Sequence, residues 1–197
     1  MNKFKNINKT LVILTTSDVF TWGFVVVINA FAGIYLETKL NVNAIQIVGI
    51  GTGIYSIVNG LLQIPVGYFI DKYKGTIDDI IVLFCGNILM GTPFLFFPII
   101  QSEYAYYFLQ LILGIGTAMN LVAWRKTFAS NLDKNKEGLE YGIYQTVMSI
   151  SIAIFGFVAG AIANISEQYF DLVMVTIGTL MASSGGFVLL LLKRTST

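Results

Sequence analysis

Long apolar segments, with the charged residues gathered between them, constrain the fold of this chain more than any other feature. A helix needs about 20 mostly apolar residues to cross a bilayer. Segments of this kind lie at about residues 10–36, 44–70, 80–100, 104–124, 141–165 and 169–192. Barrel strands are a poor alternative, because they have about ten residues with alternating polarity. The sequence therefore predicts an all-α membrane protein, a single domain over residues 1–197 with six transmembrane helices.

Charge and residue content support this prediction and exclude several classes of protein. Only 12% of the residues are charged, whereas a soluble domain has about a quarter. The net charge of +1 gives no indication of nucleic-acid binding. Histidine, the commonest general base and metal ligand, is absent, and the one cysteine, Cys85, lies inside an apolar segment. We therefore expect no enzyme, no catalytic residue, no metal site and no cofactor.

The distribution of Lys and Arg predicts the orientation, because basic residues concentrate on the cytoplasmic side. Lys39 lies alone on one side of the predicted spans. The other side holds Lys3, Lys5, Lys9, Lys72, Lys74, Arg125, Lys126, Lys134, Lys136, Lys193 and Arg194. We therefore expect a multi-pass protein of the plasma (inner) membrane with both termini in the cytoplasm.

Polar side chains recur at helical spacing in at least four of the predicted spans. Such groups are costly inside a membrane, so they should face the bundle interior or a wet cavity. We expect a solute or proton cavity lined by Asp18, Trp22 and Asn29 of the first span, Asn59 and Gln63 of the second, Gln110 and Thr117 of the fourth, and Gln145 and Ser149 of the fifth. Thr52 and Ser56 share the face of Asn59, and Asn120 adds to the polar residues of the fourth span.

Several of these residues have a second interpretation. Asp18 lies about 12 Å along the first span from position 10, at about 1.5 Å per residue, deep enough for a carboxylate that binds a proton or a cation. Alternatively, residues 15–18 cap a helix that begins at Val19. Trp22 is either a packing residue or a stacking platform, and Gln145 and Ser149 either bind solute or bridge helices.

Small residues four apart let helix backbones approach closely, so we expect them at contacts between spans. They are Gly49, Gly53 and Gly60 in the second span, Gly114 and Ala118 in the fourth, and Gly156 and Gly160 in the fifth.

The segment after the second span carries a recognisable loop motif. It reads Gly67-Tyr-Phe-Ile-Asp71-Lys72-Tyr-Lys74-Gly75. This resembles the cytoplasmic loop motif of the major facilitator superfamily, in which a glycine precedes an aspartate, a basic residue and a second glycine. Gly67, Asp71 and Lys72 match, while Lys74 stands where the motif has its second glycine. The resemblance implies a cytoplasmic gate formed by Gly67, Asp71, Lys72, Lys74 and Arg125.

Two other segments are similar to the same family. Residues 110–118 resemble its fourth-span motif, with Gln110 in place of the arginine. The residues after the fourth span that resemble its charged loop are Arg125, Asp133, Glu137 and Gly142. The fifth span has no proline beside its glycines, so the resemblance does not extend to the drug–proton antiporters.

Family members normally have twelve spans in two six-span halves. The resemblance therefore implies a half-domain of two three-helix repeats, in a secondary transporter that moves a small solute by alternating access. A parallel two-fold homodimer in the lipid bilayer would supply the second half, with Asp71 of one copy against the start of the fifth span of the other. The alternatives are a non-transporting assembly factor or scaffold, and the N-terminal half of a longer twelve-span transporter.

Overall fold

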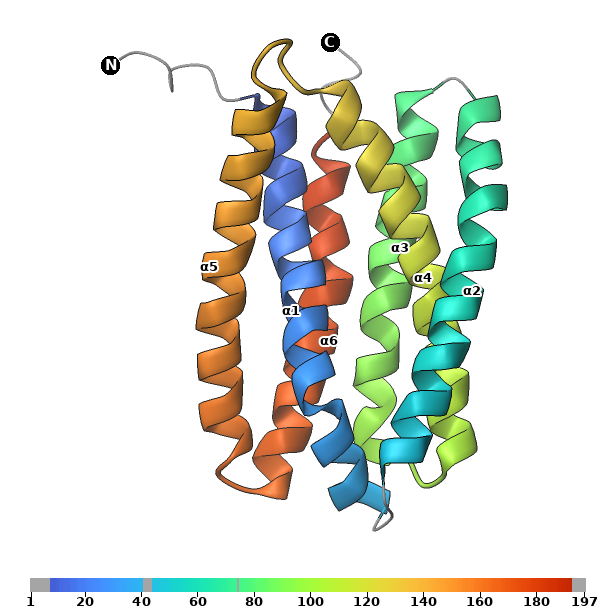
Figure 1. Ribbon diagram of the computed structural model, residues 1–197, viewed down its shortest axis with the longest axis vertical. Helices are drawn as coiled ribbons and strands as arrows, with labels where there is room; N and C mark the ends of the chain where they lie inside the picture. The colour runs from blue at the N-terminus through green and yellow to red at the C-terminus, as the bar shows by residue number, and fades with distance from the viewer. Residues whose placement is uncertain (1–7, 41–43, 74, 193–197) are drawn as a thin grey trace.

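Residues 8–40, 44–73 and 75–192 are described by the computed structural model, and within them every regular element is a helix (Figure 1). The α-helices are α1 (Lys9–Leu40), α2 (Ala44–Lys72), α3 (Thr76–Phe96), α4 (Glu103–Ser130), α5 (Glu137–Ala163) and α6 (Glu167–Leu189), and a short 3-10 helix, η1 (Phe97–Ile99), extends α3. Six spans in this part of the chain are long and apolar enough to cross a membrane, which confirms the predicted fold class.

Helix ends differ from the predicted boundaries by a few residues, because charged and polar residues continue the helices beyond the apolar segments. α1 runs on to Leu40 rather than ending at 36, and α4 runs on to Ser130 rather than 124. At the starts of α4 and α6 the hydroxyls of Ser102 and Ser166 accept hydrogen bonds from backbone N–H groups of the first turn. Such caps satisfy N–H groups that a helix start leaves unpaired.

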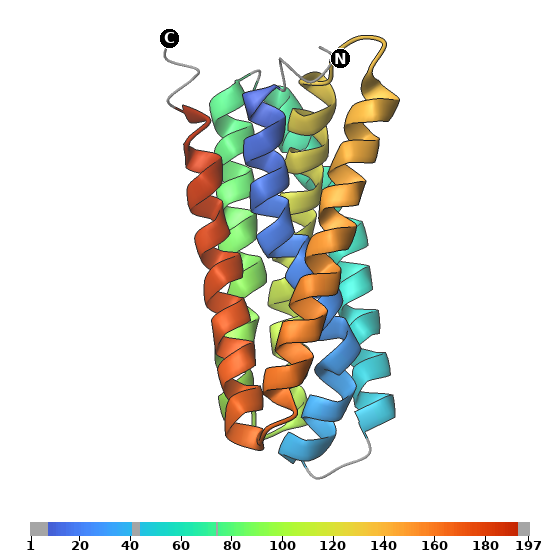
Figure 2. The same ribbon diagram turned by 90° about the vertical axis from the view of Figure 1, so that its left-hand side faces the viewer.

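The helices stand in two groups of three, with α5, α1 and α6 on the left of Figure 1 and α3, α4 and α2 on the right; Figure 2 shows the bundle from its left-hand side. α3 and α6 pack against each other, α4 lies on α3, and α1 lies on α6. α2 then packs on α4, and α5 packs on α1. Exchanging α1, α2 and α3 for α4, α5 and α6 reproduces this pattern, and α1 and α4 run in opposite directions. The fold is thus built from two three-helix repeats, as predicted, and the structure shows that they are inverted relative to each other.

Glycines let the inner helices touch backbone to backbone. A Cβ atom added to Gly91 of α3 would lie 2.4 Å from the carbonyl oxygen of Gly178 in α6. One added to Gly86 would lie 2.6 Å from the backbone nitrogen of Asn120 in α4. Separations this short exclude any side chain, so van der Waals packing of backbones holds α3 between α4 and α6.

In the outermost helices, α2 and α5, the glycines are not approached as closely as predicted. Around Gly49, Gly53 and Gly60 of α2 nothing comes within 4 Å of an added Cβ atom. In α5, the nearest atom to such a Cβ is 3.9 Å away at Gly156 and 3.4 Å away at Gly160. Within the single chain, the expected close contacts are therefore wrong for the three α2 glycines, which face no neighbouring helix, while Gly156 and Gly160 meet side chains of α1 at van der Waals distance rather than backbone.

The two ends of the bundle differ in charge. α1 begins and α6 ends at the same end, which we call the basic end (top of Figure 1). The described basic residues at this end are Lys9, Lys72, Arg125, Lys126, Lys134 and Lys136. Lys3, Lys5, Lys74, Lys193 and Arg194 lie outside the described residues. Lys39 is at the opposite end, where its ammonium group lies 2.8 Å from Asp171 Oδ2.

Candidate functional site

A cavity of about 290 Å³ lies between α1, α2 and α4, with the end of α3 and η1 contributing to its wall. Its polar groups come from Asn29 of α1, Thr52 and Tyr55 of α2, and Gln110 of α4, with the ring of Tyr106 beside them. The remaining lining is apolar. The structure therefore brings together two residues predicted to line a cavity, Asn29 and Gln110, from helices in different repeats.

Trp22 lies on the cavity-facing side of α1, about one turn from Val25, which lines the cavity. Its indole Nε1 donates a hydrogen bond to Asn120 Oδ1 of α4 at 2.8 Å. The ring is only partly buried and packs against the main apolar core. Trp22 thus connects α1 to α4 beside the cavity, and its one polar group is already bonded.

Behind Trp22, a buried polar network joins four helices. Asn120 Nδ2 donates to Asn87 Oδ1 at 2.6 Å. Asn87 Nδ2 in turn donates to Ser17 Oγ at 2.9 Å and to Ser184 Oγ at 3.1 Å. The network is uncharged, and its paired amides and hydroxyls avoid the cost of leaving polar groups unbonded. It fixes α1, α3, α4 and α6 relative to one another and holds Trp22 in place.

Asp18 is 2% exposed and lies between α1 and α5 rather than in the cavity. Its Oδ2 accepts a hydrogen bond from the hydroxyl of Tyr144 in α5, and its Oδ1 is buried with no hydrogen-bond partner among the described residues. α1 begins at Lys9, so the alternative in which Asp18 caps a helix starting at Val19 is wrong. Asp18 is a membrane-buried carboxylate with a single donor.

The other predicted cavity residues do not line this cavity. Thr117 is fully buried in α4. On α2, Gln63 donates to Asn59 Oδ1 at 3.2 Å, so these two amides bond to each other along the helix. Gln145 and Ser149 are exposed on the surface of α5. Asn59, Gln63, Gln145 and Ser149 thus lie on α2 and α5, the two outermost helices of the bundle.

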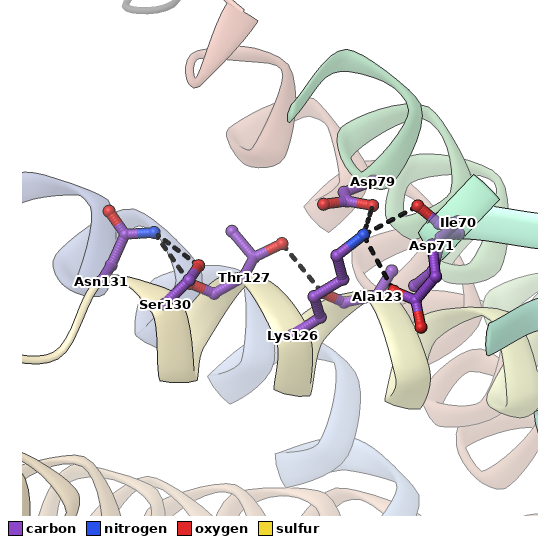
Figure 3. Close-up of polar contacts among 8 residues, drawn as sticks. All are labelled: Ile70, Asp71, Asp79, Ala123, Lys126, Thr127, Ser130 and Asn131. Carbon is purple, nitrogen blue, oxygen red and sulfur yellow. Dashed lines mark hydrogen bonds and ion pairs between the residues drawn. The ribbon is translucent and has the colours of Figure 1, made fainter. Parts of the chain in front are cut away.

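At the basic end, Lys126 of α4 joins three helices (Figure 3). Its Nζ lies 3.1 Å from Asp79 Oδ1 at the start of α3 and 3.3 Å from Asp71 Oδ1 at the end of α2. It also donates to the Ile70 carbonyl oxygen at 2.8 Å. Arg125, expected from the resemblance to belong to the gate, is exposed. The neighbouring residue, Lys126, makes the contact with Asp71.

A second polar cavity, of about 390 Å³, lies beside this ion-pair cluster, and Asp79, Thr127, Ser130 and Asn131 contribute to its wall. Its α4 side chains bond back to their own helix, as Figure 3 shows for Thr127 with the Ala123 carbonyl and for Asn131 with the Thr127 carbonyl. This cavity lies at the basic end of the bundle, away from the Asn29–Gln110 cavity.

Comparison with protein families gives one match, in which the model of the Major Facilitator Superfamily covers residues 11–197. The chain belongs to this superfamily. No curated protein and no solved structure matches it. The six-helix bundle with two inverted repeats is the half-domain expected of a superfamily member.

The superfamily loop motif of this chain occupies the connection between α2 and α3. Gly67 lies against Val122 of α4, 3.7 Å from its added Cβ position, so a small residue suits this crossing. Lys72 is exposed, with its Nζ 5.8 Å from the centre of the Tyr73 ring. Lys74 lies outside the described residues.

In the charged loop of this superfamily member, between α4 and α5, Lys136 Nζ lies 2.8 Å from Asp133 Oδ2. This hydrogen bond holds the pKa of Lys136 above its usual value. Glu140 accepts a hydrogen bond from the Asp133 backbone N–H at 2.9 Å. The loop is thus pinned to the first turn of α5.

Proposed function

We propose that this superfamily member is a secondary transporter that moves a small solute by alternating access, as a parallel two-fold homodimer. The observation that carries the proposal is the Asn29–Gln110 cavity, which has polar groups from both repeats and lies within the membrane-spanning unit, in the half opposite the basic end. In this proposal the basic end faces the cytoplasm of the cell across the plasma (inner) membrane. The two subunits rock against each other, so that solute held between them is exposed alternately to either side.

The exposed faces of α2 and α5 support a second subunit. Ser56 of α2 and Gln145 and Ser149 of α5 are exposed well inside their spans. Polar groups that face hydrocarbon are costly, so a protein or aqueous neighbour should cover them. The open glycines of α2 would also allow another helix to approach closely. A second copy would meet both conditions and enclose the cavity.

Asp71 is a suitable latch between the two subunits at the basic end. Its side chain is 73% exposed even though Oδ1 pairs with Lys126, so Oδ2 has room for another partner. The first turn of α5 in a second copy offers unpaired N–H groups and about half a positive charge. A carboxylate there is stabilised by about 0.3–1 kcal/mol when exposed. In the proposal this contact holds the cytoplasmic side shut and breaks when that side opens.

Asp18 is the group that we propose for coupling to a proton gradient. A carboxylate removed from water, with one hydroxyl donor, retains much of the cost of its charge. Taking up a proton removes that cost, and releasing it requires water or a cation to reach the carboxylate. Because the donor, Tyr144, belongs to α5, the two protonation states of Asp18 would favour different positions of α5 relative to α1.

Crosslinking between differently tagged copies tests the dimer and the latch. One copy carries Asp71→Cys and the other carries Tyr141→Cys, both with Cys85→Ser, and the two are coexpressed in membranes. Mild oxidation should give a disulfide-linked heterodimer. A matched pair with Gln168→Cys in place of Tyr141→Cys, at the opposite end of the bundle, should give none. Copies that remain monomeric in membranes and in mild detergent would refute the dimer.

Reconstituted vesicles test transport itself. Purified protein in proteoliposomes should accumulate a solute in exchange for the same solute trapped inside, and a screen of solutes would find it. Protein that assembles as a dimer but exchanges no solute in this screen would favour the scaffold alternative.

A further inference from the structure

The Asn29–Gln110 cavity has a distinctive chemistry. Its described lining contains amides, hydroxyls, aromatic rings and aliphatic side chains, and no charged side chain. We infer that the solute is an uncharged molecule with several hydrogen-bonding groups and one apolar face. The inference rests on the proposed function, because it names the class of solute that this cavity would bind.

The polar part of the cavity can both donate and accept hydrogen bonds. Asn29 and Gln110 each carry an amide with two N–H donors and a carbonyl acceptor, and they come from different helices. Thr52 adds a hydroxyl that can do either. Mixed donors and acceptors match the hydroxyl or amide groups of a neutral molecule. A carboxylate or phosphate would instead require Lys or Arg.

Two described basic residues, one at each end of the bundle, are already paired with protein groups. At the basic end, Lys126 is held by Asp71, Asp79 and a backbone carbonyl. At the opposite end, Lys39 lies between Asp171, at 2.8 Å, and Glu167, at 3.6 Å. Neither lines the cavity. An anionic solute would therefore give up its hydration without gaining a counter-ion.

A cationic solute meets the same difficulty. Asp18 faces Tyr144 of α5 and does not line the cavity. Trp22 could attract a cation through the face of its ring, but a cation held by a ring alone has no neutralising charge. In the described lining, no carboxylate is available to offset the lost hydration.

The apolar part of the lining indicates the apolar face of the solute. Trp22, beside the cavity, has its indole N–H bonded to Asn120, which is bonded to Asn87, so it has no free donor to offer. Phe94, Phe97 and Leu113 continue an apolar wall in the cavity. A solute between this wall and the amides would bury its apolar side and bond its polar side.

Tryptophan fluorescence can report binding directly, because the chain has only two tryptophans. Trp124 lies away from the cavity, stacked on Phe128 with ring centres 4.5 Å apart. Full-length Trp124→Phe protein in mild detergent therefore leaves Trp22 as the only reporter. The probes are two series of related compounds that differ in charge, glucose with gluconate and glucosamine, and inositol with inositol phosphate.

We expect at least one neutral probe to change the Trp22 fluorescence, with its charged counterparts binding at least about tenfold more weakly. Gln110→Leu should weaken the binding of the neutral probe by about tenfold or more, because the substitution removes hydrogen bonds inside the cavity. The control Gln168→Leu, on the exposed first turn of α6, should leave the affinity unchanged. Equal or tighter binding of a charged counterpart, or no response to either neutral probe, overturns the inference.

Uptake into proteoliposomes separates this inference from the proposed function. Binding of a neutral probe without uptake would contradict transport and leave the solute class intact. Uptake of gluconate, glucosamine or inositol phosphate in preference to the neutral probe would support transport and overturn the solute class.

Discussion

α2 on α4 and α5 on α1 occupy equivalent places in the two repeats, yet they are packed in different ways. An added Cβ atom at Gly114 of α4 would lie 2.9 Å from the Tyr55 carbonyl oxygen of α2. The corresponding contact at Gly23 of α1 is a looser one, 3.5 Å from the Phe155 ring of α5. α2 therefore touches its partner through backbone, while α5 touches its partner through side chains.

Aromatic rings and one hydrogen bond contribute to the contact of α5 with its neighbours. Phe155 stacks on Phe24 of α1 with ring centres 4.4 Å apart. Tyr144 donates to Asp18 and packs against Trp124 of α4 at 4.9 Å. Between α1, α5 and α6 an apolar cavity of about 370 Å³ remains. On the other side of the bundle, the Lys126 cluster ties the end of α2 directly to α3 and α4.

The difference assigns different tasks to the two outer helices. Interfaces formed by backbone against backbone have little freedom to slide, because no side chain can change rotamer to absorb the shift. Ring contacts beside a cavity can repack. We therefore expect α2 to move with α4 as one unit, and α5 to be the helix that shifts relative to its own repeat.

The largest effect should come from filling the tight interface. Gly114→Ala places a methyl group against α2 backbone and should destabilise the fold by about 1–3 kcal/mol. Gly23→Ala, its counterpart on α1, has ordinary contact distance to Phe155 and should change stability by less than about 0.5 kcal/mol. Thermal unfolding in detergent, followed by circular dichroism, measures both. Equal costs at the two sites would remove the distinction between the repeats.

The second effect concerns the hydrogen bond that joins α5 to α1. Tyr144→Phe removes the one donor to Asp18 among the described residues and should cost about 1–3 kcal/mol, the usual penalty for a buried polar group left unbonded. Tyr141→Phe is a suitable control, since Tyr141 is 43% exposed and packs on Phe128 through its ring. Similar losses in the two variants would mean that the ring, not the hydrogen bond, holds α5.

Asp18→Asn separates packing from proton coupling. The amide oxygen can still accept from Tyr144, so stability should change by less than about 1 kcal/mol. The amide cannot take up a proton, so any dependence of transport on pH should disappear. An unchanged pH profile of uptake in proteoliposomes would leave Asp18 with a packing role only.

Helical spacing predicts two residues of the cavity lining, Asn29 and Gln110, but not the polar network behind the cavity. Asn29 and Gln110 meet because each stands on the polar face of its own span. Asn87 and Ser184 were missed, since each lies on an otherwise apolar face of its helix and its partners are far away in sequence. The partner of Asp18 could have been found by comparing how far residues lie from the basic end of their helices. Positions 18 and 144 lie nine and seven residues into helices that start at 9 and 137, both at the basic end.

Of the two basic residues that could pair with Asp71 in its own chain, Arg125 and Lys126, the structure pairs Lys126. Arg125 and Lys126 are adjacent, and composition alone does not distinguish them. A helix turns by about 100° per residue, so only one of two neighbours can face α2 and α3. Glycine spacing was similarly ambiguous. It marks a face that can be approached closely, whether the neighbour is in the same chain or in another copy.

A smaller effect is expected at the ion pair that anchors α2. Asp71→Asn should cost less than about 1 kcal/mol, because its carboxylate is 73% exposed and water screens its attraction to Lys126. Lys72→Gln, at the exposed neighbouring position, serves as the control and should have no measurable effect. Chemical unfolding in detergent at low and high salt measures the stability of both variants. A loss of stability from Asp71→Asn that is as large at high salt as at low salt would argue against an ion pair.

The smallest effect on the single subunit should be at Gly60, where an added side chain meets nothing within 4 Å. Gly186 of α6 is equally open and provides a matched control. Gly60→Leu and Gly186→Leu should therefore leave the stability of the six-helix unit within about 0.5 kcal/mol.

The strength of dimerisation should differ between the same two variants. If the open face of α2 contacts a second copy, Gly60→Leu forces the two backbones apart and weakens dimerisation by about tenfold or more, whereas Gly186→Leu leaves it unchanged. Fluorescence energy transfer between labelled copies in vesicles, measured over a range of protein-to-lipid ratios, gives both dissociation constants. Equal constants would place the subunit interface elsewhere and leave α2 facing lipid, with the cost of its exposed Ser56 unexplained.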